Sequence, residues 1–301
     1  MSVLDSLLLS KAIEHYVNGL YAEGKSPKTI EAYSGNLKRF SEFCGEQKAL
    51  DITPAHIRAY LAERSQSSSS HTTHQAFRVL KTFFRWCIRE GFLETSPLAN
   101  VKAPRLANKV IPTFSPAEIK KMLSLCKQRT FLGDRNRAII PCLLDTGMRA
   151  SELIGLTLND VDFKEGLMRV KGKGDKERLI RLGNASRQAL WKYMLIRDVK
   201  ASEHEIALWL SEEMKPFTRN GLFLVIRRLG KRAAIEGVRC SPHTFRHTFA
   251  VNFLRAGGNV FDLQTLGGWS SLEMVKRYSQ SLNTEDALRA HAKFSPVDRM
   301  L

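Results

Sequence analysis

Three segments of the sequence carry charged side chains whose types and spacing suit a phosphate ester. Arg149 precedes Glu152 by three residues in DTGMRASELIGL, and Lys173 lies between two glycines in RVKGKGDKERLI. His243 and Arg246 stand three apart in HTFRHTFA, so a helix would project both from one side. A guanidinium grips phosphate oxygens as a planar fork, and the N-terminus of a helix favours an anion. Each segment alone is a weak signal, but together they indicate a site for a phosphate group.

Two aromatic residues extend this candidate set. Trp269 and Tyr278 lie nine residues apart in LGGWSSLEMVKRY. An indole N–H is a donor only, and a phenol with a pKa of about 10 is a poor nucleophile unless neighbouring groups assist it. A single tyrosine is most often a packing residue, so a chemical role for Tyr278 depends on the charged residues around it.

HTFRHTFA also permits a metal interpretation. His243 and His247 have the four-residue spacing of the helical zinc motif H-E-x-x-H. Thr244 occupies the place of the general-base glutamate, and the sequence offers no matching third ligand. We therefore expect no metal here, and we expect His247 to be a structural histidine in a supporting role.

The composition points to a polyanionic partner. Lys and Arg number 47 against 30 Asp and Glu, which gives a net charge of +17 and a pI near 9.9. A basic balance of this size is typical of nucleic-acid binding.

The five cysteines include no C-x-x-C pair, so neither a disulfide framework nor a zinc finger is indicated, and a reducing compartment is expected. We expect no signal peptide, no membrane span and, without a G-x-x-x-x-G-K-[ST] motif, no nucleoside triphosphate site.

The elements that position these residues fall into two regions. Residues 10–100 show helical periodicity, with Thr53 and Pro54 starting one helix, and SQSSSSHTT is expected to form a flexible polar loop. Proline-rich sequence then predicts a linker at 104–113 between domains at 1–103 and 114–301. In the second domain VDF, GLMRV and ERLIRL predict three short strands, and helical patterns return from residue 184. The expected fold class is mainly α: a helical N-terminal domain followed by a mostly helical domain with a small three-stranded antiparallel sheet.

The ordered set resembles the tyrosine recombinase (phage integrase) family, and within it the compact Xer-like members. The blocks TGMRASEL, GKGDKERLI, HTFRHTFA and LGGWSSLEMVKRY match that family in order and approximate spacing, and GKSPKTIEAYSGNLKRF resembles its SAM-like core-binding domain. The resemblance covers about residues 10 to 295.

The resemblance implies a mechanism and a role for each residue. Tyr278 would attack a DNA phosphodiester and form a covalent 3′-phosphotyrosine, with strands exchanged in sequence and without metal, ATP or any other cofactor. The catalytic set would be completed by an arginine clamp, a lysine acid and two further donors, with Glu152 as a supporting residue: Arg149, Arg246, Lys173, His243 and Trp269.

The resemblance also implies partners. The two domains would form a C-shaped clamp on a double-stranded recombination site, with candidate N-terminal contacts at Lys28, Thr72, Gln75 and Arg78. The tail after Tyr278 has a helical pattern that includes Ala287, Leu288, Ala290 and Phe294, and it would dock on a neighbouring subunit of a DNA-bound tetramer. A second recombinase or an accessory protein would be a further partner, and the location would be cytoplasmic, at the nucleoid.

The biological role would be resolution of chromosome or plasmid dimers, or integration and excision of a mobile element. Three alternatives are weaker. The compact length argues against a relaxing topoisomerase or a telomere-resolving enzyme of the same chemistry. A catalytically silent DNA-binding protein would have no need of Tyr278 or Lys173, and a zinc hydrolase lacks its ligands.

Overall fold

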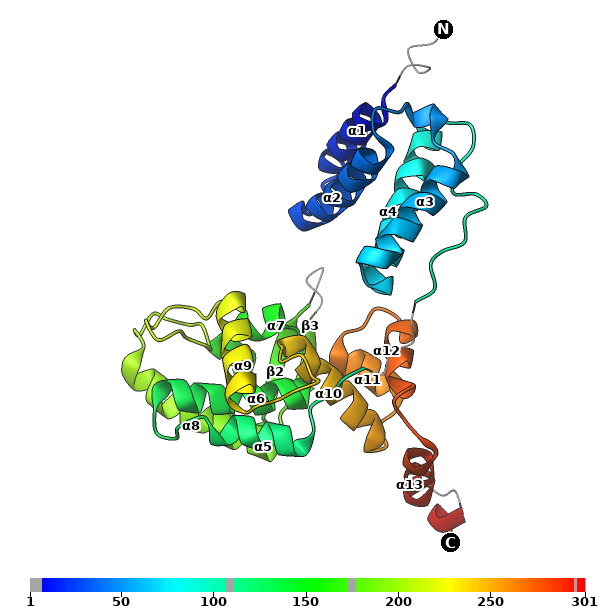
Figure 1. The fold of residues 1–301 in the computed structure, drawn as a ribbon. Coiled ribbons are helices and arrows are strands. Elements are labelled where there is room, and N and C mark those ends of the chain that lie inside the picture. The colour runs from blue at the N-terminus through cyan, green and yellow to red at the C-terminus, as the bar shows by residue number, and fades with distance from the viewer. Residues whose placement is uncertain (1–6, 107–110, 173–176, 295–296, 301) are drawn as a thin grey trace. The chain divides into compact units, whose positions relative to one another are not determined.

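The structure is a computed structural model that describes residues 7–106, 111–172, 177–294 and 297–300. The chain divides into two compact units, Met1–Lys109 and Val110–Leu301. The described residues of unit 1 are helical and those of unit 2 are mostly helical with one small antiparallel sheet, which confirms the expected fold class (Figure 1).

The described residues of unit 1 form a bundle of four α-helices around one core. The helices are α1 (Leu9–Ala22), α2 (Pro27–Cys44), α3 (Pro54–Ser67) and α4 (Ser70–Arg89). Thr53 caps α3 as expected, with Pro54 as the first helical residue. Aromatic rings fill the interior, where Phe40, Phe83 and Phe84 are fully buried.

The expected loop at SQSSSSHTT is wrong. Helix α3 continues to Ser67 and α4 begins at Ser70, so only two residues separate the helices. The hydroxyl of Ser69 accepts a hydrogen bond from the backbone N–H of Thr72 and caps α4. Serine favours such a capping position, because its side chain satisfies an otherwise unpaired N–H of the first turn. The serine run is therefore a helix boundary rather than a loop.

Unit 2 begins with helices α5 (Pro116–Ser124), α6 (Phe131–Thr146) and α7 (Ala150–Ile154). Strands β1 (Val161–Asp162), β2 (Leu167–Lys171) and β3 (Glu177–Arg181) follow and form a sheet in the order β1-β2-β3. Both pairs are antiparallel, with Met168 opposite Ile180. The sheet packs its buried side chains, Met168, Val170 and Ile180, into the main core of the unit.

The α-helices that follow the sheet in the described part of unit 2 are α8 (Asn184–Lys200), α9 (Arg219–Arg232), α10 (Pro242–Arg255), α11 (Val260–Gly267), α12 (Leu272–Ser279) and α13 (Thr284–Phe294). Helix α10 is central, because most of its side chains are buried and it packs on α6, α9, α11 and α12. A second, smaller core joins α10, α11 and α12 and contains both Trp269 and Tyr278. Helix α13 extends away from the body of the unit (Figure 1).

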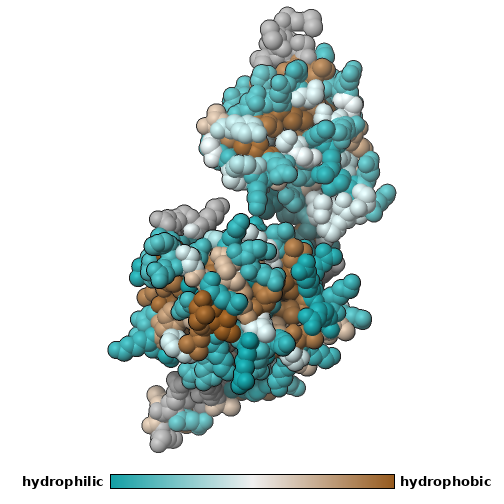
Figure 2. Space-filling model, turned by 90° about the vertical axis from the view of Figure 1, so that its left-hand side faces the viewer, coloured by the Kyte–Doolittle hydropathy of each residue, from teal (hydrophilic) through white to brown (hydrophobic). Residues whose placement is uncertain are grey.

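Helix α8 leaves an apolar stripe exposed. Trp191, Leu195 and Val199 lie one turn apart and are 55%, 57% and 86% exposed. Figure 2, which looks at the molecule from the left-hand side of Figure 1, shows hydrophobic side chains gathered on this face of unit 2. None of the described helices is long and apolar enough to cross a membrane.

Candidate active site

Most of the candidate residues lie where helices begin or end. Arg149 occupies the N-cap position of α7, three residues after α6 ends at Thr146 with Gly147 as its left-handed cap. His243 and Arg246 lie in the first turns of α10, which Ser241 caps. Trp269 lies between α11 and α12, and Tyr278 lies near the end of α12. Lys173, expected on the β2–β3 hairpin, is outside the described residues.

Arg246 is buried and held on three sides. Its Nη1 donates to the carbonyl of Gly147 at 2.6 Å, and its Nη2 donates to the carbonyl of Gly267 at 2.7 Å. These carbonyls lie at the C-terminal ends of α6 and α11, where the helix dipoles favour a cation. The guanidinium also lies over the Trp269 ring, 3.9 Å from its centroid. The orientation of Arg246 is thus fixed by the fold itself.

Arg149 is oriented by Glu152. Its Nη1 donates to Glu152 Oε1 at 2.7 Å, and its Nη2 donates to the carbonyl of Gly268 at 3.0 Å. Glu152 also accepts the backbone N–H of Arg149, so one carboxylate holds both the side chain and the turn. The side chain of Arg149 remains 38% exposed, which leaves part of the guanidinium accessible to a ligand.

The sequence analysis missed Arg178 of β3. Its Nη2 donates to Glu152 Oε2 at 2.8 Å, and its Nε donates to the carbonyl of Leu266 at 2.8 Å. Strand alternation places Arg178 on the same face as the buried Ile180, and its side chain is only 11% exposed. A charged residue on the inward face of a strand is the signal that would have found it.

Positive charge exceeds negative charge at this site. Three guanidiniums, those of Arg149, Arg178 and Arg246, surround the single carboxylate of Glu152. Burial and the neighbouring Arg149 lower the pKa of Arg246 to about 10, which still leaves it protonated at neutral pH. Burial by itself would raise the pKa of Glu152, but hydrogen bonds from Arg178 and Arg149 lower it. Among the described residues, the site therefore lacks an anion to balance its charge.

A cavity of about 600 Å³ opens onto these groups. Arg149, His243, Arg246, His247 and Trp269 all line it. Two exposed arginines that the sequence analysis did not select line it as well, Arg219 at the start of α9 and Arg239 before α10, and none of the described lining residues is acidic. The cavity is thus suited in size and charge to a phosphate and its attached groups.

The histidine that contacts Tyr278 is His247. Its Nδ1 lies 3.0 Å from the phenolic oxygen, and both side chains are buried. His243 is exposed at the cavity wall and packs edge-on against His247, with 4.2 Å between ring centroids. Burial, followed by nearby arginines, lowers the pKa of His243, and burial raises the pKa of Tyr278. His247, expected only as a structural histidine, therefore lies within the candidate site.

The zinc interpretation finds no ligand set. No group of three or more His, Cys, Asp or Glu residues within the described part of the chain could hold a metal ion. The charged neighbours of the two histidines on α10 are cations, because Arg246 and Arg277 act on both rings and Arg149 and Arg239 act on His243. Such surroundings favour an anion over a metal cation.

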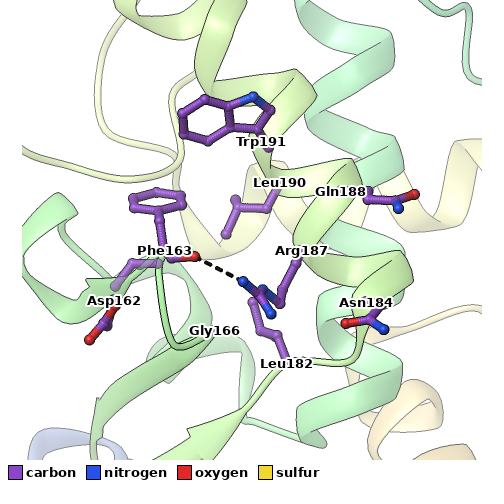
Figure 3. Close-up of a pocket in the computed structure, with 10 residues that line it drawn as sticks. Asp162, Phe163, Gly166, Leu182, Asn184, Arg187, Gln188, Leu190 and Trp191 are labelled. Carbon is purple, nitrogen blue, oxygen red and sulfur yellow. Dashed lines mark hydrogen bonds between the residues drawn. The ribbon is translucent and has the colours of Figure 1, made fainter.

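A separate hollow lies between the β1–β2 turn and α8 (Figure 3). The rings of Phe163 and Trp191 meet edge to face there, with centroids 6.2 Å apart. Arg187 in this hollow donates to the backbone carbonyls of Phe163 and Lys164. None of the catalytic candidates that the structure describes lines this hollow, so we do not assign it to the candidate active site.

The four candidate DNA contacts lie in unit 1. Lys28 is exposed in the first turn of α2, and Gln75 and Arg78 are exposed on α4. Thr72 is half-buried, and its hydroxyl is hydrogen-bonded to that of the capping Ser69 at 2.9 Å. The same exposed side of α4 continues with Lys81, Arg85 and Arg89, which makes it a basic helix surface.

Comparison with known proteins matches both units. A model described as phage integrase family matches residues 112–285, and one described as phage integrase, N-terminal SAM-like domain matches residues 12–92. Tyrosine recombinase XerC of Myxococcus xanthus is 32% identical over 282 residues, which are 90% of this chain and 93% of that protein.

Two solved structures are similar to this chain. The crystal structure of XerA recombinase is 26% identical, with a TM-score of 0.54 and coverage of 95% of this chain and 99% of that one. The structure of the Tn1549 transposon integrase in complex with transposon right end DNA has a TM-score of 0.77 and 20% identity, and covers 94% and 99% of the two chains. The second likeness concerns the fold alone.

Proposed function

Because the chain belongs to the phage integrase family and is a tyrosine-type site-specific DNA recombinase of the Xer kind, we propose that Tyr278 attacks a DNA phosphodiester held between Arg149 and Arg246. The observation that carries this assignment is the unbalanced positive charge beside a buried tyrosine. The two arginines are oriented by helix-end carbonyls and by Glu152, so their remaining donors are aimed before any ligand arrives.

The proposed cleavage conserves one ester bond. The phenol gives up its proton, which His243 would accept, and its oxygen forms a bond to phosphorus while the bond from phosphorus to the 5′ oxygen breaks. The products are a 3′-phosphotyrosine and a free 5′ hydroxyl. Lys173 would give its proton to the departing 5′ oxygen. Rejoining reverses these steps with the 5′ hydroxyl of another strand, and the retained ester linkage supplies the free energy without ATP.

The remaining candidates would stabilise the charge that develops on the phosphate. His243 lines the cavity and is exposed to it, so it suits a hydrogen bond to a phosphate oxygen. Trp269 supports the plane of Arg246, and its indole N–H is a further donor. Glu152 acts through Arg149 rather than on the substrate, and is a positioning residue.

The proposed ligand is duplex DNA that contains a recombination site. Unit 1 would contribute Lys28, Thr72, Gln75 and Arg78, and the two units would clamp the duplex between them, joined by a linker at 104–113. The net charge of +17 and the basic side of α4 support this assignment. The chain would act on the nucleoid in the cytoplasm, as a tetramer joined through α13, with a second recombinase or an accessory protein at some sites.

The proposed biological role is resolution of chromosome or plasmid dimers, or integration and excision of a mobile element. The DNA around the gene distinguishes the two roles. Inverted repeats of about one helical turn each around a short spacer would mark the site. Their presence at a replication terminus supports dimer resolution, and their presence beside the gene at the end of an inserted element supports mobility.

A nicked duplex that contains the site tests the chemistry. Single-turnover incubation without metal, in the presence of a chelator, should give a covalent protein–DNA adduct on a denaturing gel. Tyr278→Phe should bind the same duplex and give no adduct. Adduct formation by Tyr278→Phe, or a strict requirement for zinc, would overturn the proposal.

A further inference from the structure

His247 and Tyr278 form a buried pair that links α10 to α12. The imidazole Nδ1 and the phenolic oxygen are 3.0 Å apart, and the ring centroids are 5.5 Å apart. Tyr278 is 2% exposed and His247 is 9% exposed. The hydrogen bond is therefore shielded from water, and loss of either partner would leave a buried polar group unpaired.

The surroundings of the pair keep the imidazole neutral. His243 and Arg246 face it from α10, Arg277 faces it from α12, and Arg149 lies beyond Arg246. Burial, then His243 and these arginines, lower the pKa of His247 to about 3. Burial also raises the pKa of Tyr278, so the phenol keeps its proton. Since a phenol is a better donor than a neutral imidazole and an imidazole nitrogen is the better acceptor, the phenol donates to Nδ1.

His247 lies between the nucleophile and the cavity. It lines the cavity together with Arg149, Arg246 and Trp269, whereas Tyr278 is not among the lining residues. The phenol must therefore break its hydrogen bond to His247 before its oxygen forms a covalent bond to phosphorus. The position of Nδ1 therefore determines the position of the phenolic oxygen before it attacks.

We propose that His247 is a positioning residue for the nucleophile, which accepts the phenolic hydrogen bond of Tyr278 and so fixes the hydroxyl behind the phosphate-binding cavity. The inference rests on the proposed function, because it assigns the attacking oxygen to Tyr278. The role is one of orientation, since the surrounding positive charge disfavours a protonated imidazole. A misplacement of about 1 Å in a reacting group can reduce a rate by roughly a hundredfold.

Three substitutions separate orientation from other roles. His247→Asn keeps a polar atom close to the position of Nδ1, because both are two bonds beyond Cβ. His247→Gln carries the same amide one carbon farther out and is the matched control, and His247→Ala removes the acceptor. All three are compared with the wild type on the nicked duplex for DNA affinity, thermal midpoint and single-turnover adduct formation.

The expected result is a split between binding and cleavage. His247→Asn should form the adduct within about threefold of the wild-type rate, whereas His247→Gln and His247→Ala should be slower by about tenfold or more, with DNA affinity unchanged in all three. Equal rates for wild type and His247→Ala would overturn the proposal. A His247→Asn variant that folds and is as slow as His247→Ala would overturn it too, because a correctly placed acceptor would then be insufficient.

A measurement on the free protein tests the direction of the hydrogen bond. In the 15N spectrum of histidine-labelled protein, the His247 ring should carry its proton on Nε2, with Nδ1 unprotonated. A proton on Nδ1 would make His247 the donor and would overturn the proposal. Failure of the wild type to form any adduct would instead count against the proposed function, while the tautomer would still report on the pair.

Discussion

The guanidinium of Arg246 lies 3.9 Å from the centroid of the Trp269 ring, so the indole supports the plane of the arginine from one face. The helix-end carbonyls of Gly147 and Gly267 hold the edge of the same guanidinium. Position and plane are thus set by different elements, since the carbonyls belong to α6 and α11 and the ring belongs to the turn before α12.

Substitution of Trp269 should separate stacking from hydrogen bonding. Trp269→Phe keeps an aromatic face for Arg246 and loses the N–H, whereas Trp269→Leu loses both. Since a buried cation–π contact is worth about 2 kcal/mol, Trp269→Leu should cleave about 30-fold more slowly than wild type, with Trp269→Phe between them. Single-turnover adduct formation measures this order. If Trp269→Phe is as slow as Trp269→Leu, stacking of the ring on Arg246 does not contribute to the cleavage rate.

Loss of Arg178 should impair cleavage without removing a phosphate ligand. Arg178 donates to both oxygens of Glu152 and to the carbonyl of Leu266, so it fixes the carboxylate that orients Arg149. Arg178→Met should reduce adduct formation by about tenfold or more, because Arg149 would lose its fixed orientation. The control is Arg181→Met, which removes an exposed arginine from the same strand. Equal cleavage by the two variants would contradict a positioning role for Arg178.

The residues that define the family were accessible from the sequence because their types and order are visible in it. The start of α3 at Thr53 was accessible for a similar reason, since this side chain caps its helix locally. The serine run before α4 was misassigned because a serine-rich stretch and a serine cap have the same composition.

The contacts of His247 and Arg178 were not accessible, because they depend on segments far apart in the chain. His247 meets Tyr278 only when α12 packs on α10, and Arg178 meets Glu152 only when β3 lies beside α7. The helix-end carbonyls that hold Arg246 are backbone groups, and no side-chain motif reports them.

His247 should make the protein sensitive to acid. Its pKa of about 3 is below the ordinary value of 6.5, so between these pH values the unfolded chain binds a proton that the folded protein does not. The free energy of unfolding therefore falls as the pH falls, by up to about 1.4 kcal/mol per pH unit from this group. His247→Asn should show a correspondingly smaller slope in chemical unfolding between about pH 6 and pH 4.

The matched control for this pH dependence is His204→Asn, which removes an exposed imidazole from the same unit. Glu152 has a lowered pKa and loses stabilising bonds as the pH falls, but it is present in every variant and cancels from the comparison. Parallel slopes for wild type and His247→Asn would show that His247 is not buried in its neutral form.

The two exposed arginines of the cavity should contribute to DNA binding through charge. Arg219 and Arg239 line the cavity, and the described part of its wall contains no carboxylate. Each phosphate contact releases counterions, so Arg219→Ala and Arg239→Ala should each reduce the slope of log affinity against log salt by about 1. Fluorescence anisotropy with a site-containing duplex at several salt concentrations measures the slope. Lys200→Ala, at the end of α8, is the control, and a slope that falls equally in the control would contradict a specific contact.

Helix α13 should mediate assembly rather than cleavage. Its only described buried residue is Asp286, which lies 3.7 Å from Nε of Arg255, while Leu288 is 65% exposed. An exposed leucine on a helix that extends from the body suits burial against a neighbouring subunit, which is worth about 1.5–3 kcal/mol. Leu288→Glu should therefore weaken formation of the two-site complex by roughly tenfold or more on native gels. Its thermal midpoint and its cleavage of an isolated nicked site should match those of the wild type. Glu285→Ala, an exposed change on the same helix, should assemble normally. Normal assembly by Leu288→Glu would exclude this face of α13 from the subunit interface.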